Sequence, residues 1–171
     1  MSTSSWIGFR NKDKTIRFIY CHHDGYIKDG VGETLVKHYS DPETINKLLD
    51  LGDLSALGTE PVENLLAWDD NARQSLIRYI LVSPEKYFKE YNRLYPKNQC
   101  ECYKTRGDEN WEAHTEENEK IYGEKFEKTF NDYCYLYKND KWYYKAGKTW
   151  QKVSDRLGKR EVKLDEQNQD G

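Results

Sequence analysis

The sequence predicts an α+β fold: a mainly antiparallel sheet formed from both chain ends, with helices packed on one face and a helical insertion. Near the N-terminus, apolar and polar residues alternate over Thr15–Tyr20, which follows Trp6–Arg10 after a polar turn and indicates a β-hairpin. Near the C-terminus, Tyr133–Val153 contains three short runs separated by turns, which indicates a strand meander. The chain between these ends has mostly helical spacing.

Two short helices are predicted after the N-terminal hairpin. Val31 and Leu35 fall at helical spacing directly after a glycine-rich turn. Asp41 and Pro42 then supply an N-cap and a first helical residue, the usual start of a second helix. Residues 53–58 follow as a tight, partly buried loop. We expect both helices to cover the same face of the sheet.

The middle of the chain is predicted to be a helical insertion, residues 61–97, within a single domain over residues 1–157. Ser83 and Pro84 give a strong helix-start signal inside this insertion. Charged and amide side chains dominate the end of the sequence, so residues 158–171 are predicted to form a disordered tail.

The chain between the insertion and the meander is predicted to contain one strand and one loop. Residues 99–105 have the pattern of a strand, with its two cysteines on one side and Glu101 and Tyr103 on the other. Residues 107–120 are acidic and poor in apolar residues, so we expect a solvated loop that enters a helix near Thr115.

The composition limits the classes of function. The 171 residues are 36% hydrophobic, 33% charged and 14% aromatic, so tyrosine and tryptophan must supply much of the core. The net charge is −3 with both signs interspersed, which gives no general signal for nucleic acid. No stretch resembles a signal peptide or approaches the ~20 apolar residues of a membrane span. We therefore expect a cytoplasmic protein with no membrane partner and four reduced cysteines.

The richest stretch of potential chemistry is the turn after the hairpin. His22, Asp24 and Tyr26 cluster there, just before the helix that begins at Val31 and Gly32. On one interpretation these five residues form a pocket in which the free N–H groups of the helix bind a phosphate or another anion. On the other, Cys21 is a core residue, His22 bonds a backbone carbonyl and Asp24 caps the turn.

Two enzymatic or metal-based interpretations are weaker. Cys21, Cys100 and Cys102 with a histidine could bind zinc, but no pair has the usual Cys-x₂₋₄-Cys spacing, so no metal and no cofactor is predicted. A terminal Ser2 could act as a nucleophile, as could Cys21 with His22 or His38, but no orienting third group can be assigned. We predict no catalytic residue.

Several short stretches form a pattern along the chain. They are Met1-Ser2-Thr3, Ile7-Gly8, Tyr20-Cys21-His22, Asp24-Gly25-Tyr26, Gly30-Val31-Gly32, Leu35, His38-Tyr39, Leu51 to Gly58 and Tyr133 to Tyr143. In these stretches the chain resembles a family of small proteins found mainly in bacteriophages and prophages. The resemblance covers about the first 58 residues and the last hairpin, and leaves the insertion unmatched. It departs from the family pattern at Ser4, at His23 and at Ile27–Lys28.

The resemblance implies a phage source but no particular activity. Because of this source, we expect a small protein that binds and blocks host machinery. The expected function is therefore non-enzymatic binding and inhibition of a host protein, such as a defence component, in the manner of an anti-CRISPR. Phe88 and Tyr95 are the predicted partner anchors, because the insertion carries more aromatic residues than one core-facing stripe needs. Arg106 and Trp111 form a second candidate recognition turn. The alternative is a small hydrolase or a nucleotide- or phosphate-binding protein that uses the His22/Asp24 turn.

Overall fold

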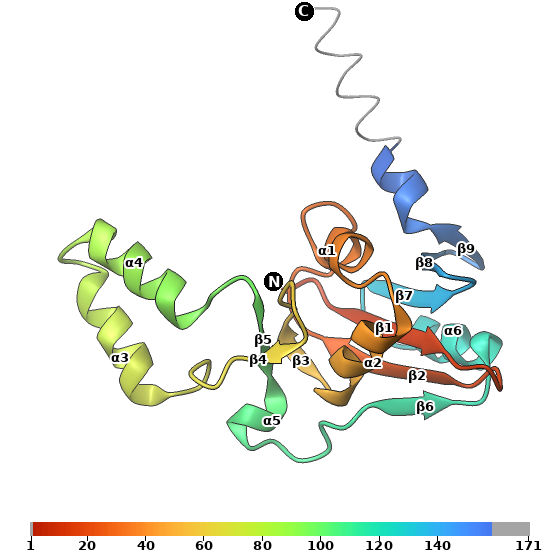
Figure 1. Ribbon diagram of the computed structural model, residues 1–171, viewed down its shortest axis with the longest axis horizontal. Helices are drawn as coiled ribbons and strands as arrows, with labels where there is room; N and C mark the ends of the chain where they lie inside the picture. The colour runs from red at the N-terminus through yellow and green to blue at the C-terminus, as the bar shows by residue number, and fades with distance from the viewer. Residues whose placement is uncertain (1, 159–171) are drawn as a thin grey trace, which may run out of the picture.

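The computed structural model describes residues 2–158 and has the predicted α+β fold (Figure 1). The predicted tail falls almost entirely on residues 159–171, outside the described part. Residues 153–158 are helical. The other elements are, in order, β1 (Ser5–Arg10), β2 (Ile16–Cys21), α1 (Val31–His38), α2 (Pro42–Asp50), β3 (Leu54–Ala56), β4 (Val62–Glu63), α3 (Asp70–Tyr79), α4 (Pro84–Leu94), β5 (Gln99–Cys102), α5 (Tyr103–Arg106), β6 (His114–Glu116), α6 (Glu119–Glu127), β7 (Tyr133–Lys138), β8 (Lys141–Ala146) and β9 (Thr149–Lys152).

The sheet is mainly antiparallel, as predicted, but mixed: among residues 2–158 five strand pairs are antiparallel and three are parallel. Its strand order is β4-β5-β3-β2-β1-β7-β8-β9, and β6 pairs with β2 beside this path. The two predicted hairpin regions are antiparallel, as expected. The two chain ends, however, meet through a parallel pair, β1 with β7, and β2–β3 and β4–β5 are also parallel. These parallel pairs join strands far apart in sequence, so no turn signal marks them.

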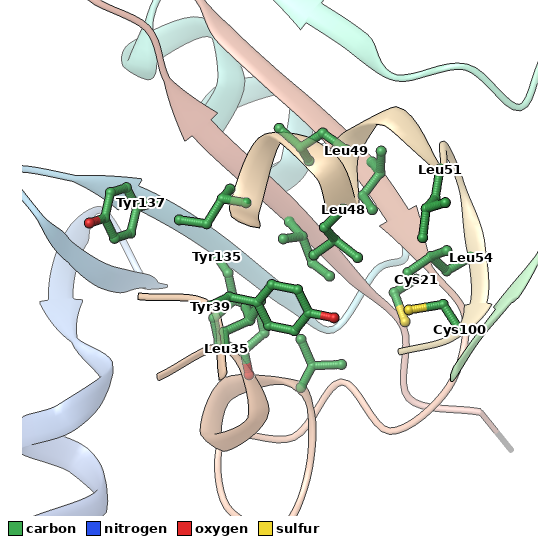
Figure 2. Packing of buried hydrophobic residues seen from close by; sticks show 14 of the residues in the cluster. Cys21, Leu35, Tyr39, Leu48, Leu49, Leu51, Leu54, Cys100, Tyr135 and Tyr137 are labelled. Atoms are coloured by element: carbon green, nitrogen blue, oxygen red, sulfur yellow. The ribbon is translucent and has the colours of Figure 1, made fainter. Parts of the chain in front are cut away.

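Helices cover both faces of the sheet, not one face as predicted. On one face, α1 and α2 pack over the larger core cluster, in which Leu35, Tyr39 and Leu48 are fully buried (Figure 2). On the other face, α6 places Tyr122 against Phe18. The reason lies in β2, which has buried apolar residues on both of its sides, so each face needs a cover.

Two predicted loops contain short strands. Residues 53–58 include β3, which extends the sheet from β2. Residues 107–120 include β6, and the following helix begins at Glu119 with Asn118 as its N-cap, later than Thr115. Both strands are only three residues long, so they show no periodicity of their own and exist because a neighbouring strand edge pairs with them.

The predicted helical insertion forms a helical hairpin, α3 and α4, that extends away from the sheet beyond β4 and β5 (Figure 1). The predicted start of α4 is confirmed, since the Ser83 hydroxyl accepts a hydrogen bond from the Lys86 amide at 3.3 Å. Asp69 caps α3 in the same way. No residue of α3 is buried, and α4 buries only Leu94. Among residues 2–158, no helix has the length and apolar character needed to cross a bilayer.

Candidate functional site

The turn after β2 is held by backbone hydrogen bonds. The amides of His22 and His23 donate to the carbonyls of Leu54 and Ser55 at 3.0 Å each, which continues the β2–β3 pairing by two residues. The chain then turns at Asp24, whose φ is +56°. An aspartate tolerates this left-handed conformation better than most residues. The histidines therefore lie at the end of the sheet, and Asp24 starts the loop to α1.

The N–H groups at the start of α1 are already occupied. Val31 donates to the carbonyl of Asp24 at 2.8 Å, and Gly32 donates to the carbonyl of Tyr26 at 3.0 Å. Glu33 donates to the same loop at 2.8 Å. Val31 and Gly32 are also buried. The expectation of an anion site with free amides at this helix start is therefore wrong: the loop folds back and satisfies those donors itself.

The polar side chains of the turn do not converge as predicted. The Nδ1 atom of His22 lies 2.6 Å from the Tyr20 hydroxyl, and burial lowers the pKa of His22, with His23 adding a smaller effect. Tyr26 is exposed and takes no part in the neighbouring cleft. Only Asp24, together with His23, lines that cleft. The His22 and His23 rings contact each other edge to face, with centroids 4.6 Å apart, but only His23 lines the cleft.

An open cleft of about 580 Å³ lies between this turn and the helical hairpin. Its sheet side is formed by the turn, β3 and β5, and its hairpin side by α3, α4 and the residues just before α3. The lining residues are His23, Asp24, Ser55, Ala56, Ala67, Trp68, Arg73, Leu76, Ile77, Tyr91, Tyr95 and Glu101. Both charged and aromatic side chains therefore meet in one cavity.

Glu101 is one of the charged residues that line the cleft, and it is half-buried. It lies between Cys100 and Cys102 in β5, and the side chains of both cysteines are fully buried. Glu101 therefore points to the opposite face of the strand, as the alternation predicted. Burial raises the pKa of the Glu101 carboxyl; the nearby His23 and Arg73 reduce this effect and Asp24 adds to it. Among residues 2–158, no side chain forms a hydrogen bond or ion pair with it.

The phenols of α4 face the same carboxylates. Burial is the main cause that raises the pKa of Tyr91, and the charges of Glu101 and Asp24 add to it. Burial likewise raises the pKa of Tyr95, with Arg73 opposing the effect and Glu101 reinforcing it. The two rings lie 5.0 Å apart between centroids. Tyr95, predicted as a partner anchor that points aside, is thus half-buried and forms part of the cleft wall.

The predicted recognition turn at Arg106 and Trp111 is engaged within the fold. The guanidinium of Arg106 lies 4.9 Å from the Trp68 ring centroid and 4.8 Å from that of Tyr103, and it pairs with Asp108. The Trp111 carbonyl accepts a hydrogen bond from the Asp53 amide at 2.7 Å. These contacts connect α5 and the following loop to Trp68, just before α3, and to Asp53, just before β3. Both residues therefore have a structural role.

Phe88 belongs to the exposed apolar surface of the helical hairpin. We call this the hairpin surface. It consists of exposed apolar side chains from the end of α3, from the α3–α4 connection and from α4. Phe88 is 63% exposed and Leu81 is 94% exposed. The members of the hairpin surface are Ile77, Ile80, Leu81, Val82 and Phe88.

The cysteines are core residues. The Cys21 thiol donates a hydrogen bond to the backbone carbonyl of His23 at 3.6 Å, and no hydrogen bond joins it to an imidazole within residues 2–158. Burial strongly raises its pKa, so the thiol is a poor nucleophile. His38 lies exposed at the end of α1. Within residues 2–158, no three histidine, cysteine or carboxylate side chains are grouped so that they could hold a metal ion.

Comparison of the chain with models of protein families, with curated proteins and with solved structures finds no match. Sequence reasoning overlooked Trp68 and Arg73 as cleft residues, and placed Glu101 on the correct side of its strand without assigning it a role. The strand alternation around Glu101 was the one local signal available, and only the docking of the hairpin beside β5 turns that side into a cavity.

Proposed function

We propose that this chain is a non-catalytic binding protein that attaches to a partner protein through its hairpin surface. In keeping with the phage resemblance, the partner is a host protein of the cytoplasm, such as a component of an antiviral defence system, which the chain inhibits in the manner of an anti-CRISPR.

The observation that carries this proposal is that α3 buries none of its residues. A ten-residue helix that shows apolar side chains to water gains little from the fold it belongs to, because helix stability in proteins comes mainly from burying one face. The hairpin surface adds Leu81 and Val82 at the helix–helix connection and Phe88 on α4. Large exposed apolar groups concentrated on one projecting element are typical of protein-interaction sites.

A protein partner fits this surface better than a membrane or a nucleic acid. The hairpin carries Arg78, Lys86 and Lys89 but also Glu85 and Glu90, so its polar groups are of both signs. A mixed polar rim around an apolar centre is the usual composition of a protein–protein interface. A nucleic-acid or anionic-lipid surface would instead call for an excess of basic residues.

The proposal is tested by affinity purification of the tagged chain from infected host cells. The variant combines Leu81→Asp with Phe88→Ala, and the matched control is Phe130→Ala, which changes a fully exposed phenylalanine just after α6. The wild type and the control should retain one host protein in equal molar amount, and the double variant should lose it at unchanged thermal stability. Each anchor should contribute ~2 kcal/mol or more to binding.

Two results would refute this function. One is stoichiometric retention of the same host protein by the double variant. The other is concentration-dependent self-association of the purified chain that the double variant abolishes, because the hairpin surface would then join two copies of the chain.

A further inference from the structure

Glu101 differs from the other carboxylates of similar burial. Each of the other half-buried acidic side chains among residues 2–158 has a hydrogen-bond or ion-pair partner, whereas Glu101 has none. Those with partners are Glu33, Asp53, Glu63, Glu90, Asp108, Glu116 and Glu119. The Glu101 carboxylate still faces the open cleft, so a cation that enters the cleft can pair with it.

The surroundings of Glu101 specify the chemistry of the missing partner. Asp24, whose side chain is exposed, brings a second negative charge to the cleft. Trp68, Tyr91 and Tyr95 supply aromatic surface beside these two carboxylates. A cation gains both from opposite charge and from the faces of aromatic rings, and a planar guanidinium gains most because it can stack and bond two carboxylates at once.

We propose that this cleft accepts an arginine side chain of the partner, between the carboxylates of Asp24 and Glu101 and the aromatic wall of Trp68, Tyr91 and Tyr95. This inference rests on the proposed function and names the chemistry that the partner must present. The hairpin surface provides apolar contact area, and the cleft at the base of the hairpin selects a partner that presents a positive charge.

The chain already contains one example of this arrangement. Arg106 places its guanidinium near the rings of Trp68 and Tyr103 while it pairs with Asp108. Trp68 belongs to both places, since it also lines the cleft. Its indole N–H donates to the Cys102 carbonyl at 2.9 Å, which fixes the ring at the cleft wall. Trp68 thus lies beside the Arg106–Asp108 pair and also lines the cleft that contains Asp24 and Glu101.

Arg73 carries a positive charge that repels a cation entering the cleft. It lines the cleft from α3, is exposed, and forms no ion pair within the described residues, although its charge reaches Glu101. Removing this charge should therefore improve binding of a guanidinium, whereas removing the charge of Glu101 should weaken it. Two neutral substitutions in one cavity are then expected to act in opposite directions.

The test uses Nα-acetyl-L-arginine N-methylamide as the probe, titrated into the full-length ¹⁵N-labelled chain. Its neutral counterpart, the matching citrulline derivative, has nearly the same shape and no charge. The arginine probe should shift the Trp68 indole N–H resonance in a saturable manner, and the citrulline probe should not. Glu101→Gln should raise the Kd about tenfold, the effect of one lost hydrogen bond to a charged group. Asp24→Asn should also raise the Kd, and Arg73→Gln should lower it.

Several results would overturn the inference. They are equal shifts with both probes, shifts confined to residues outside the cleft, or an unchanged Kd in both Glu101→Gln and Asp24→Asn. Tighter binding of spermidine than of the arginine probe would assign the cleft to a free small cation instead.

The two proposals fail separately. The hairpin variant Leu81→Asp/Phe88→Ala should leave probe binding intact, because neither residue lines the cleft. If the probe does not bind while this variant still abolishes partner capture, the cleft inference is wrong and the proposed function stands. If the probe binds as expected and capture survives the hairpin variant, the hairpin is not the docking surface.

Discussion

The hydroxyl of Tyr135 donates a hydrogen bond to the carbonyl of Gly25 at 2.6 Å and thereby joins β7 to the turn after β2. The Tyr135 side chain is fully buried, and burial raises its pKa far above the ordinary range. The Gly25 amide in turn donates to the Thr3 carbonyl at 2.8 Å. The position of Asp24 at the cleft therefore depends on both ends of the chain.

Tyr135→Phe should destabilise the fold by ~1–3 kcal/mol, since the Gly25 carbonyl would remain buried without a donor. Chemical denaturation at neutral pH measures the change. Tyr144→Phe on β8 is the matched control: its hydroxyl also forms one hydrogen bond, to Gln151, but at an exposed site. The control should change stability by less than ~0.5 kcal/mol. Equal losses in both variants would contradict the structural role assigned to the Tyr135 hydroxyl.

Gly52→Ala should cost more than Gly107→Ala, although both glycines have positive φ, +75° and +91°. A methyl group at position 52 would lie 2.2 Å from the Trp111 carbonyl oxygen, whereas nothing lies within 4 Å at position 107. The left-handed backbone alone should cost ~1–2 kcal/mol at either site. Displacing Trp111 should add ~1–3 kcal/mol at position 52. Thermal unfolding of the two variants tests this, and similar losses would show that Trp111 moves freely.

The four thiols should react slowly with Ellman's reagent in the folded protein. All are buried, and burial raises the pKa of Cys102 and of Cys134 to about 12 each. The thiolate is the reactive form, so both access and ionisation limit the reaction. In denaturant all four should react at once. A single thiol that reacts rapidly without denaturant would point to a catalytic or redox role that the present assignment denies.

Glu101→Gln should stabilise the protein at neutral pH and lose this advantage in acid. Burial raises the pKa of Glu101, so the unfolded chain ionises more readily as the pH increases. The stabilising contribution of the protonated carboxyl is complete below the ordinary value of 4.5 and is lost as the pH rises through the raised value. Denaturant midpoints of both proteins between pH 4 and neutrality measure the difference.

His23, Asp24 and Arg73 also face Glu101, so the Glu101→Gln comparison should be repeated in the Arg73→Gln background. There the pH dependence should grow, since Arg73 no longer offsets the burial of the carboxyl. A stability difference between the wild type and Glu101→Gln that stays constant at every pH would show that the carboxylate is solvated. A residue retained at a cost in stability is typical of a binding site.

The features that sequence alone predicted correctly are the local ones. The N-terminal hairpin, the Asp41–Pro42 start of α2 and the Ser83–Pro84 start of α4 each follow from residues close together in the chain. The alternation of Glu101 with two cysteines also holds. Capping hydrogen bonds and strand alternation involve residues close together in the chain, so they can be predicted without knowledge of the rest of the fold.

Tertiary structure alone decided how these pieces meet. The parallel β1–β7 pair, the cover of α6 on the second face and the three-residue strands β3 and β6 all depend on contacts distant in sequence. The same is true of the turn, where loop carbonyls occupy the Val31 and Gly32 amides that sequence reasoning left free. A backbone donor is satisfied by whichever acceptor the folded chain brings near it. Likewise, Glu101 faces a cleft only because the helical hairpin lies beside β5.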